Sequence, residues 1–238
     1  MDLSQHVQAV QTRVTQAALR AGRDPGEITL CAATKVQTDD TIRAAISAGI
    51  RVCGENRVQE LTAHLAADAY AGAKEVHFIG HLQTNKVKQV VGRVALIQSV
   101  DSERLLRAID VQAEKLGLVQ DVLLEINIAG EESKGGCLPK DLPALLDFVP
   151  TLRHVRLRGL MAIPPVSPTP GANRPYFSAM RQLFVDIKGK MSDNQDDITC
   201  LSMGMSNDFE DAISEGATLV RVGTALFGPR PPIIPQTL

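Results

Sequence analysis

Strand-like and helix-like segments alternate along almost the whole chain, and this alternation restricts the fold more than any other feature. Eight short apolar runs have the length and composition of buried strands; they cover residues 28–36, 51–54, 75–80, 94–100, 120–128, 155–163, 198–204 and 218–223. Helical periodicity fills most of the intervals, at residues 39–48, 56–67, 102–116, 141–149, 174–190 and 207–215. A further amphipathic helix precedes the first run and extends to about Ala21. Strands that alternate with helices favour a parallel sheet over a β-sandwich.

Eight strands with intervening helices predict an α/β fold, a single TIM-type (β/α)8 barrel with an extra N-terminal helix, forming one domain over residues 1–238. The alternative is an open, doubly wound sheet, which needs a glycine-rich turn after its first strand. The segment Lys35-Val36-Gln37 stands there instead, so the barrel is favoured. Helix starts are predicted at Asp101, Asp141 and Ser206, and helix stops at Gly49, Gly117 and Gly216.

The composition is that of an ordinary globular protein, with 44% hydrophobic and 22% charged residues and a formal net charge of -2. No charge bias favours nucleic acid or an anionic membrane as a partner, and the N-terminal segment lacks the apolar core of a signal peptide. We therefore expect a cytoplasmic protein. A monomer is a separate expectation that the composition does not test. Four widely spaced cysteines without CxxC spacing predict free, largely buried thiols rather than disulfides or a metal site; they are Cys31, Cys53, Cys137 and Cys200.

The first strand carries a lysine at the end where barrels of this kind place their functional groups. Because side chains alternate along a strand, Lys35 shares a face with Ala33 and Cys31, and these small residues leave room for a ligand beside the amine. A lysine in a partly desolvated, cationic pocket loses its proton more easily and can form a Schiff base with a carbonyl group. A solvated lysine at the end of a strand is the alternative.

The eighth strand carries an arginine within an apolar run. Leu219, Arg221 and Gly223 face one way, while Val220 and Val222 face the other. Arg221 is therefore predicted to point into the barrel, where its guanidinium needs an acceptor.

Residues after the seventh and eighth strands favour a phosphate group. Gly223 lets main-chain N–H groups approach an anion closely, and Thr224 adds a hydroxyl donor. Ser206 would begin a helix whose N-terminus attracts phosphate, and many TIM barrels bind phosphate at these two loops. An ordinary helix cap at Ser206 and a simple turn at Gly223 are the alternatives.

Several long motifs, in one order, resemble those of the YggS/PROSC family, the pyridoxal-phosphate homeostasis proteins. They are ATK (33–35), GENRVQE (54–60), HFIGHLQTNK (77–86), ESKGG (132–136), RGLMAIP (158–164), LSMGMSND (201–208) and VRVGT (220–224). The resemblance implies a barrel like that of alanine racemase, with pyridoxal 5'-phosphate (PLP) bound as an internal aldimine, a Schiff base with a lysine. Carried over to this chain, it makes Lys35 the aldimine lysine and places Arg221 against the pyridine nitrogen. It places Ser206, Gly223 and Thr224 on the phosphate.

The resemblance also implies that Asn56 and the Ser202-Met203 segment line the cofactor. Asn56 could equally cap the helix that it precedes. For His77 and His81, near the end of the third strand, a structural hydrogen bond is favoured over contact with the pocket.

The chain departs from the family pattern at Gln37, where many members carry a second lysine, so a transfer or regulatory role at that position does not carry over. Lys134 is another amine near the rim, for which the solvated-lysine interpretation is favoured. The loop Pro164 to Pro175 is either a flap over the mouth or an inert surface excursion. The sequence leaves open whether the tail from Pro229 to Leu238 packs against the barrel.

The predicted site favours binding over turnover. A fixed cation at the pyridine nitrogen disfavours protonation of that nitrogen and weakens the electron sink. Racemases with this arrangement use a tyrosine from another domain as a second base, and neither Tyr70 nor Tyr176 is predicted at a strand end. We therefore predict a PLP-binding protein that maintains PLP homeostasis, with PLP-dependent apo-enzymes as candidate acceptors. The alternatives are a weak PLP-dependent amino-acid racemase and a cofactor-free aldolase in which Lys35 attacks a phosphorylated sugar.

Overall fold

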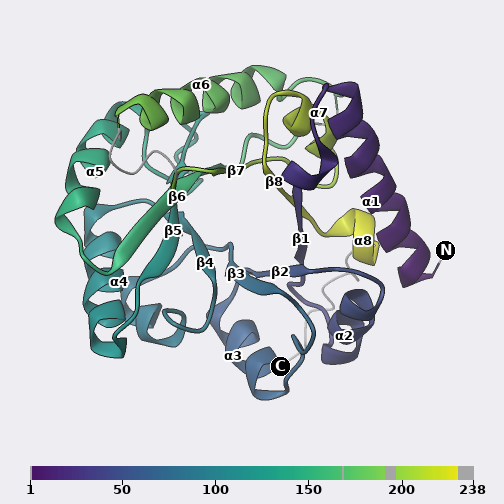
Figure 1. Cartoon of the computed structure of the whole chain (residues 1–238), viewed down its shortest axis with the longest axis horizontal. Coiled ribbons are helices and arrows are strands. Elements are labelled where there is room, and N and C mark those ends of the chain that lie inside the picture. Colours follow the sequence, from purple (N-terminus) through teal and green to yellow (C-terminus); the bar gives the residue numbers. More distant parts are fainter. Residues whose placement is uncertain (1, 168, 191–196, 230–238) are drawn as a thin grey trace, which may run out of the picture.

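Eight parallel strands close into a barrel in their order along the chain, with helices around the outside (Figure 1). This computed structural model describes residues 2–167, 169–190 and 197–229. The strands are β1 (Thr29–Ala33), β2 (Val52–Glu55), β3 (Glu75–Phe78), β4 (Leu96–Val100), β5 (Gln120–Ile126), β6 (Val155–Ala162), β7 (Cys200–Ser202) and β8 (Leu219–Val222). Seven strands lie wholly within their predicted runs and β2 extends one residue beyond its run. The predicted TIM-type barrel is therefore confirmed.

The helices follow the predicted intervals closely. They are α1 (Leu3–Arg20), α2 (Asp39–Ser47), α3 (Val58–Ala66), α4 (Glu103–Leu116), α5 (Leu142–Phe148), α6 (Arg174–Lys190), α7 (Phe209–Ser214) and α8 (Thr224–Phe227). The 3-10 helices are η1 (Pro25–Glu27), η2 (Thr84–Gln89), η3 (Pro139–Asp141) and η4 (Val149–Thr151). Among the α-helices of the described residues, α8, a single turn directly after β8, is the one without a predicted counterpart, and η1 and η2 also lie outside the predicted intervals.

The extra N-terminal helix α1 packs against α7 and α8 on the outside of the barrel (Figure 1). Its start is fixed by a capping box, in which the Gln5 N–H donates to Asp2 Oδ1 at 2.8 Å and the Asp2 N–H donates to Gln5 Oε1 at 3.0 Å. Its buried side chains recur at helical spacing and form one face; they are Val7, Val10, Val14, Ala17 and Ala18.

Side chains of β8 point alternately to the core between barrel and helices and to the barrel interior. Val220 and Val222 belong to the large core between barrel and helices. Leu219 belongs to a small cluster with Cys31, Ala33, Val52 and Ile79 inside the barrel. The inward direction predicted for the Leu219, Arg221 and Gly223 face is thus confirmed, because side chains two residues apart share a face.

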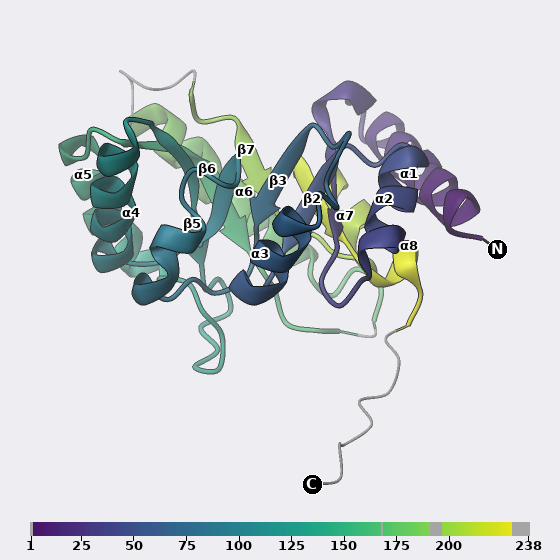
Figure 2. The same cartoon turned by 90° about the horizontal axis from the view of Figure 1, so that it is seen from below.

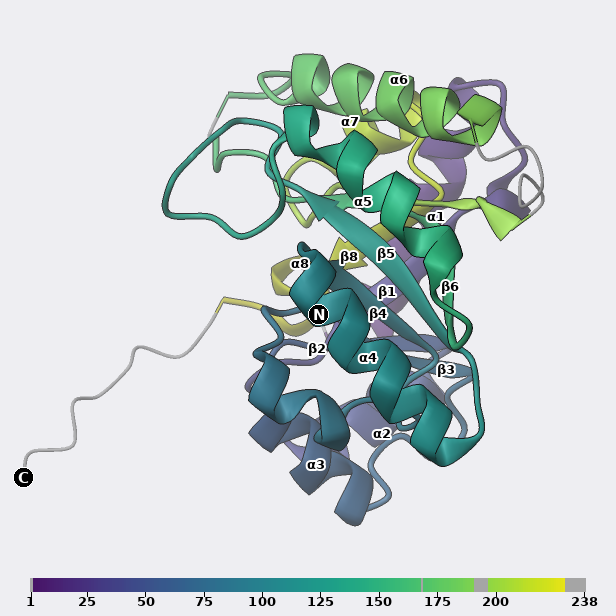
Figure 3. The same ribbon diagram turned by 90° about the vertical axis from the view of Figure 1, so that its left-hand side faces the viewer.

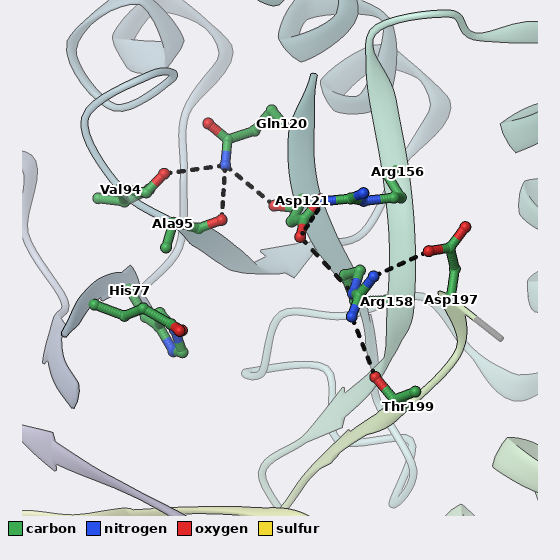
Figure 4. A network of polar contacts seen from close by, with 10 residues as sticks. His77, Val94, Ala95, Gln120, Asp121, Arg156, Arg158, Asp197 and Thr199 are labelled. Carbon is green, nitrogen blue, oxygen red and sulfur yellow. Dashed lines mark hydrogen bonds and ion pairs between the residues drawn. The ribbon is translucent and has the colours of Figure 1, made fainter. Parts of the chain in front are cut away.

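An ion-pair network ties β5, β6 and the segment before β7 together at the amino end of the barrel (Figure 4). Asp121 accepts a hydrogen bond from Arg156 Nε at 2.6 Å and lies 3.7 Å from Arg158 Nε. Arg158 also donates to Asp197 at 3.0 Å and to Thr199 Oγ1 at 3.4 Å. Charged groups at this end of a barrel serve stability rather than chemistry.

Two of the three predicted helix starts are wrong. The N-cap of α4 is Ser102 rather than Asp101, since the Ser102 hydroxyl accepts from the Leu105 N–H. The N-cap of α7 is Asp208 rather than Ser206, because the chain makes a further turn after β7 before the helix begins. Asp141 stands at the predicted N-cap of α5, although its side chain makes no capping hydrogen bond. The glycine stops are confirmed by positive φ angles at Gly49, Gly117 and Gly216.

The loops after β5 and β6 extend from the same side of the barrel, where α8 also lies (Figure 2). The loop after β5 projects furthest on that side in the orthogonal view (Figure 3). All four cysteines are free thiols, as predicted, and Cys31, Cys53 and Cys137 are buried. Among the described residues no helix is both long and apolar enough to cross a membrane. Residues 230–238 of the tail lie outside the described residues.

Candidate functional site

A cavity of about 290 Å³ opens at the carboxyl ends of the strands, bounded by β1, β8 and the loops after β2, β6 and β7. A small cofactor needs a hollow of about this size. Six of the eight predicted cofactor residues line the cavity; they are Lys35, Asn56, Ser206, Arg221, Gly223 and Thr224.

Lys35 stands on the turn that follows β1, above Ala33 and the fully buried Cys31. The next residue, Val36, has a φ of 60°, a left-handed conformation that is unusual for a β-branched side chain. Its N–H donates to Glu60 Oε2 in α3 at 3.0 Å. A strained turn held by a neighbouring helix thus places the lysine in the cavity wall.

Arg221 lies on β8, which is hydrogen-bonded to β1, the strand before Lys35. Cys31 of β1 and Arg221 of β8 are paired residues. Its side chain is 4% exposed. Nη1 donates to Ser202 Oγ, and Nη2 donates to the carbonyl oxygen of Ala162 at 2.8 Å. Burial lowers the pKa of the Arg221 guanidinium, but an arginine stays charged at neutral pH. Both acceptors are neutral, so the cavity receives a positive charge that neither of them cancels.

Ser206 joins the ends of β7 and β8. Its hydroxyl oxygen accepts hydrogen bonds from the N–H groups of Gly223 and Ala225, each at 3.2 Å. The hydroxyl proton therefore remains for another acceptor. Within the described part of the chain, the N–H groups of Ser206, Asn207 and Thr224 donate to no acceptor. These donors surround one corner of the cavity and form an arrangement that suits an anion.

Asn56 presents an unsatisfied acceptor beside this cavity. Its Oδ1 atom is buried without a hydrogen-bond partner in the described structure. A buried orphan acceptor is costly unless a ligand or water donates to it. The N-cap of α3 is Arg57, so the alternative that Asn56 caps this helix is wrong. The main chain of Asn56 is held tightly by Gly80, where a Cβ atom would lie 2.1 Å from the Asn56 carbonyl oxygen.

Ser202 and Met203 do not line the cavity with their side chains. Ser202 is fully buried beneath Arg221 and accepts its Nη1–H. Met203 is fully buried in the core between barrel and helices. The cavity is lined instead by the residues of the turn that follows β7, Met205 to Asp208.

The two histidines of the third strand region have different environments. His77 is 2% exposed and contacts Glu75 and Gln98, so the predicted structural hydrogen bond is confirmed for this residue. His81 is exposed and lines a separate hollow beside Asp101 and Arg104.

Gln37 and Lys134, the two other positions considered from the sequence, have different surroundings. Gln37 lines the cavity. Lys134 donates to the carbonyl oxygen of Ile163 at 3.3 Å and pairs with Glu131 at 2.8 Å, so it is tethered rather than simply solvated.

Glu125 was not anticipated from the sequence. It is the penultimate residue of β5, on the face that Leu123 presents to the barrel interior, and it is 8% exposed. Burial raises the pKa of Glu125 to about 7, against the opposing attraction of Arg221. Alternation along QDVLLEI would have revealed the inward carboxyl.

A second buried carboxyl lies on the outer side of the barrel, behind the lysine turn. Thr34 Oγ1 and the Tyr70 hydroxyl both donate to Glu55 Oε1, the latter at 3.0 Å. Burial raises the pKa of Glu55. Tyr70 is thus engaged away from the cavity, and Tyr176 belongs to α6 and does not line it.

Comparison with known proteins gives consistent results. A family model described as "Alanine racemase, N-terminal domain" matches residues 6–231. The pyridoxal phosphate homeostasis protein of Aquifex aeolicus (strain VF5) is 42% identical over 234 residues, which cover 97% of this chain and 99% of that protein. The structure of PipY from Synechococcus elongatus PCC7942 with PLP bound is 33% identical, with a TM-score of 0.82, covering 95% of this chain and 100% of that chain. An alanine racemase from Clostridium difficile 630 shares the fold alone, with a TM-score of 0.70 at 12% identity, and the match covers 95% of this chain and 57% of that one.

Proposed function

The chain belongs to the family of the pyridoxal phosphate homeostasis proteins, and from this premise we propose that its cavity binds PLP through a Schiff base with Lys35. One observation carries the assignment: a lysine, a buried arginine held by neutral acceptors, a set of anion donors and an orphan acceptor line the same cavity. Each suits one part of the cofactor, which has an aldehyde, a ring nitrogen, a phosphate and a ring hydroxyl.

Arg221 would lie against the ring nitrogen, and the hydroxyl of Ser206 with the N–H groups of Ser206, Asn207 and Thr224 would hold the phosphate. Asn56, whose Oδ1 has no partner in the described structure, would contact the polar edge of the ring beside the ring oxygen. Gly223 lines the same corner and, without a side chain, leaves room there for the ligand.

The protein is a binding and delivery protein in this proposal, without catalytic turnover. When bound, the cofactor supplies an electrophilic aldehyde and an electron sink that depends on protonation of its ring nitrogen. A fixed guanidinium beside that nitrogen penalises a second positive charge. Among the described lining residues the only carboxylate is Asp208, which accepts from the Met205 N–H at 2.7 Å and from Asn173 Nδ2 at 2.7 Å. Among the lining residues that the structure describes, none is therefore placed to act as the second base that a racemase or an aldolase needs.

Delivery to PLP-dependent apo-enzymes, a cytoplasmic location and a monomeric state complete the proposal. Four free thiols support a reducing compartment.

The test is the absorbance spectrum of the purified protein mixed with PLP, compared with that of Lys35→Ala. The wild type is expected to give a yellow band that Lys35→Ala lacks. Lys134→Ala is the matched control, because this lysine is near the rim but tethered to Ile163 and Glu131, and it should keep the band. A wild type without a band would contradict the cofactor assignment.

Racemisation is tested separately, by incubating the loaded protein with L-alanine or L-serine and measuring the D-enantiomer. Racemisation faster than that by free PLP, and absent in Lys35→Ala, would contradict the carrier proposal and support the racemase alternative.

A further inference from the structure

A chain of hydrogen bonds runs through the barrel interior from Arg221 to the amino end. Arg221 Nη1 donates to Ser202 Oγ, and Ser202 Oγ donates to Gln98 Oε1 at 2.7 Å. Gln98 Nε2 lies 3.0 Å from His77 Nδ1, and His77 Nε2 lies 2.9 Å from Glu75 Oε2. The chain therefore connects β8, β7, β4 and β3 by side chains alone.

The direction of every bond follows from the chemistry of its members. Arg221 can only donate, so Ser202 accepts from it, and the Ser202 hydroxyl donates in turn to the amide oxygen of Gln98. That choice turns the amide nitrogen of Gln98 toward His77. His77 Nδ1 is then the acceptor and Nε2 carries the proton, which it donates to Glu75. In this direction every donor points away from the cavity, and the matching tautomer of His77 is the Nε2–H form.

The side chains that follow Arg221 in this hydrogen-bond chain are buried. Ser202 and Gln98 are each 0% exposed and His77 is 2% exposed, so no water competes for their hydrogen bonds. The carboxylate that ends the chain is Glu75, at the start of β3, where Lys74 Nζ lies 3.5 Å away. The hydrogen bond from His77 lowers the pKa of Glu75 to about 2, which keeps this terminal acceptor ionised. The Glu75 carboxylate is thus three side chains removed from Arg221, whose own hydrogen bonds go to the neutral oxygens of Ser202 and Ala162.

We propose that Gln98, acting with His77 and Ser202, is a positioning residue that fixes the direction of the Arg221 guanidinium and keeps its charge directed at the ligand in the cavity. The ligand in question is the ring nitrogen of PLP, so the inference rests on the proposed function. None of the three side chains lines the cavity, and each acts through Arg221.

Gln120 offers a matched control. It is likewise a buried glutamine in a strand, at 2% exposure. Its amide nitrogen donates to the carbonyl oxygens of Val94, Ala95 and Asp121, at 3.2, 3.3 and 3.2 Å, and it has no part in the chain (Figure 4). Gln120→Met and Gln98→Met therefore remove the same chemical group at similar burial. Only Gln98→Met should change the position of the Arg221 guanidinium.

The first measurement uses the protein without cofactor. The ring nitrogens of His77 are observed by 15N NMR and assigned by comparison with His77→Gln. Wild type and Gln120→Met should show the single Nε2–H tautomer, and Gln98→Met should lose this preference because Nδ1 no longer has a donor. A charged ring or an Nδ1–H tautomer in the wild type at neutral pH would overturn the proposed direction of the chain.

The second measurement titrates the absorbance band of the PLP-loaded protein against pH and determines the PLP dissociation constant. Gln98→Met should weaken PLP binding about tenfold and shift the titration midpoint, whereas Gln120→Met should lower the melting temperature without moving either quantity. Charged or ionisable groups that also lie near Arg221 are present in every variant, so they cancel in the comparison; they are Cys31, Glu125, Cys200 and Asp208.

Gln98→Glu provides a second, isosteric variant in case Gln98→Met does not fold. A carboxylate at this position brings negative charge to within one residue of Arg221, so the titration midpoint should move further than a mere loss of packing would move it. Unchanged binding and titration in the Gln98 variants, beside a normal wild-type band, would overturn the positioning role alone. No band in the wild type would instead overturn the proposed function, while the tautomer measurement would still test the chain.

Discussion

The hydroxyl oxygen of Ser206, after β7, accepts a 3.2 Å hydrogen bond from the N–H group of Gly223, after β8. The serine predicted to cap a helix instead joins the two loops that bound the anion corner of the cavity. Because its oxygen is occupied as an acceptor, the hydroxyl proton is directed elsewhere, and the cavity that Ser206 lines is where an anion would receive it.

Ser206→Ala should weaken PLP binding about ten- to a hundredfold, since a hydrogen bond to a charged group is worth roughly 1.5–3 kcal/mol. Binding of pyridoxal, which lacks the phosphate, should change little. The measurement is the ratio of the two dissociation constants. Ser214→Ala is the control, because its hydroxyl donates to the Glu210 carbonyl oxygen on the protein surface. An equal loss for both ligands would argue against a phosphate contact.

Gly80→Ala should lower both stability and PLP affinity. The new Cβ atom would lie 2.1 Å from the Asn56 carbonyl oxygen and 2.7 Å from its Cα atom, so the main chain must move. Overpacking of this kind costs about 1–3 kcal/mol, and the shift would carry Asn56 away from the cavity. Urea unfolding and PLP titration measure the two effects. At Gly189, in α6, a Cβ atom would meet nothing within 4 Å, so Gly189→Ala should be neutral or stabilising.

Glu125→Gln should change how stability depends on pH. Burial raises the pKa of Glu125 from 4.5 to about 7, so the folded state binds this proton more tightly than the unfolded chain does. The stability that this group contributes is complete below pH 4.5 and is lost as the pH rises through about 7. The wild type should therefore lose up to roughly 3 kcal/mol over this window that Glu125→Gln retains.

Unfolding by urea at several pH values between 4.5 and 8 makes the Glu125 comparison, with Glu132→Gln as a control at an exposed loop carboxyl. Parallel stability curves for wild type and Glu125→Gln would show that the buried carboxyl does not bind a proton in this range.

The barrel and the faces of β1 and β8 could be predicted from the sequence because periodicity reports burial directly. Arg221 stood out for this reason, as one charge within an apolar run whose alternation turned it inward. Lys35 was identified by its place at a strand end. The helix starts at Asp101 and Ser206 were mistaken because several capping residues stand close together, and only the backbone geometry decides which one is used.

The chain of hydrogen bonds from Arg221 to Glu75 could not have been predicted in the same way. Gln98 lies in a mainly apolar run where β4 shifts register against β5 between Ile97 and Val100, so alternation does not give its direction. His77 and Ser202 find their partners on other strands, which only the closed barrel brings together. Their roles depend on long-range contacts that a single segment does not encode.

The most direct test of the account is to reduce the PLP-loaded wild type with borohydride, digest it and locate the modified residue by mass spectrometry. We predict that the pyridoxyl group is found on Lys35, and that Lys35→Ala treated alike retains none at any site in stoichiometric amount. A modification spread over surface lysines, or fixed at Lys134 with Lys35 unmodified, would contradict the assignment of this cavity as the PLP site.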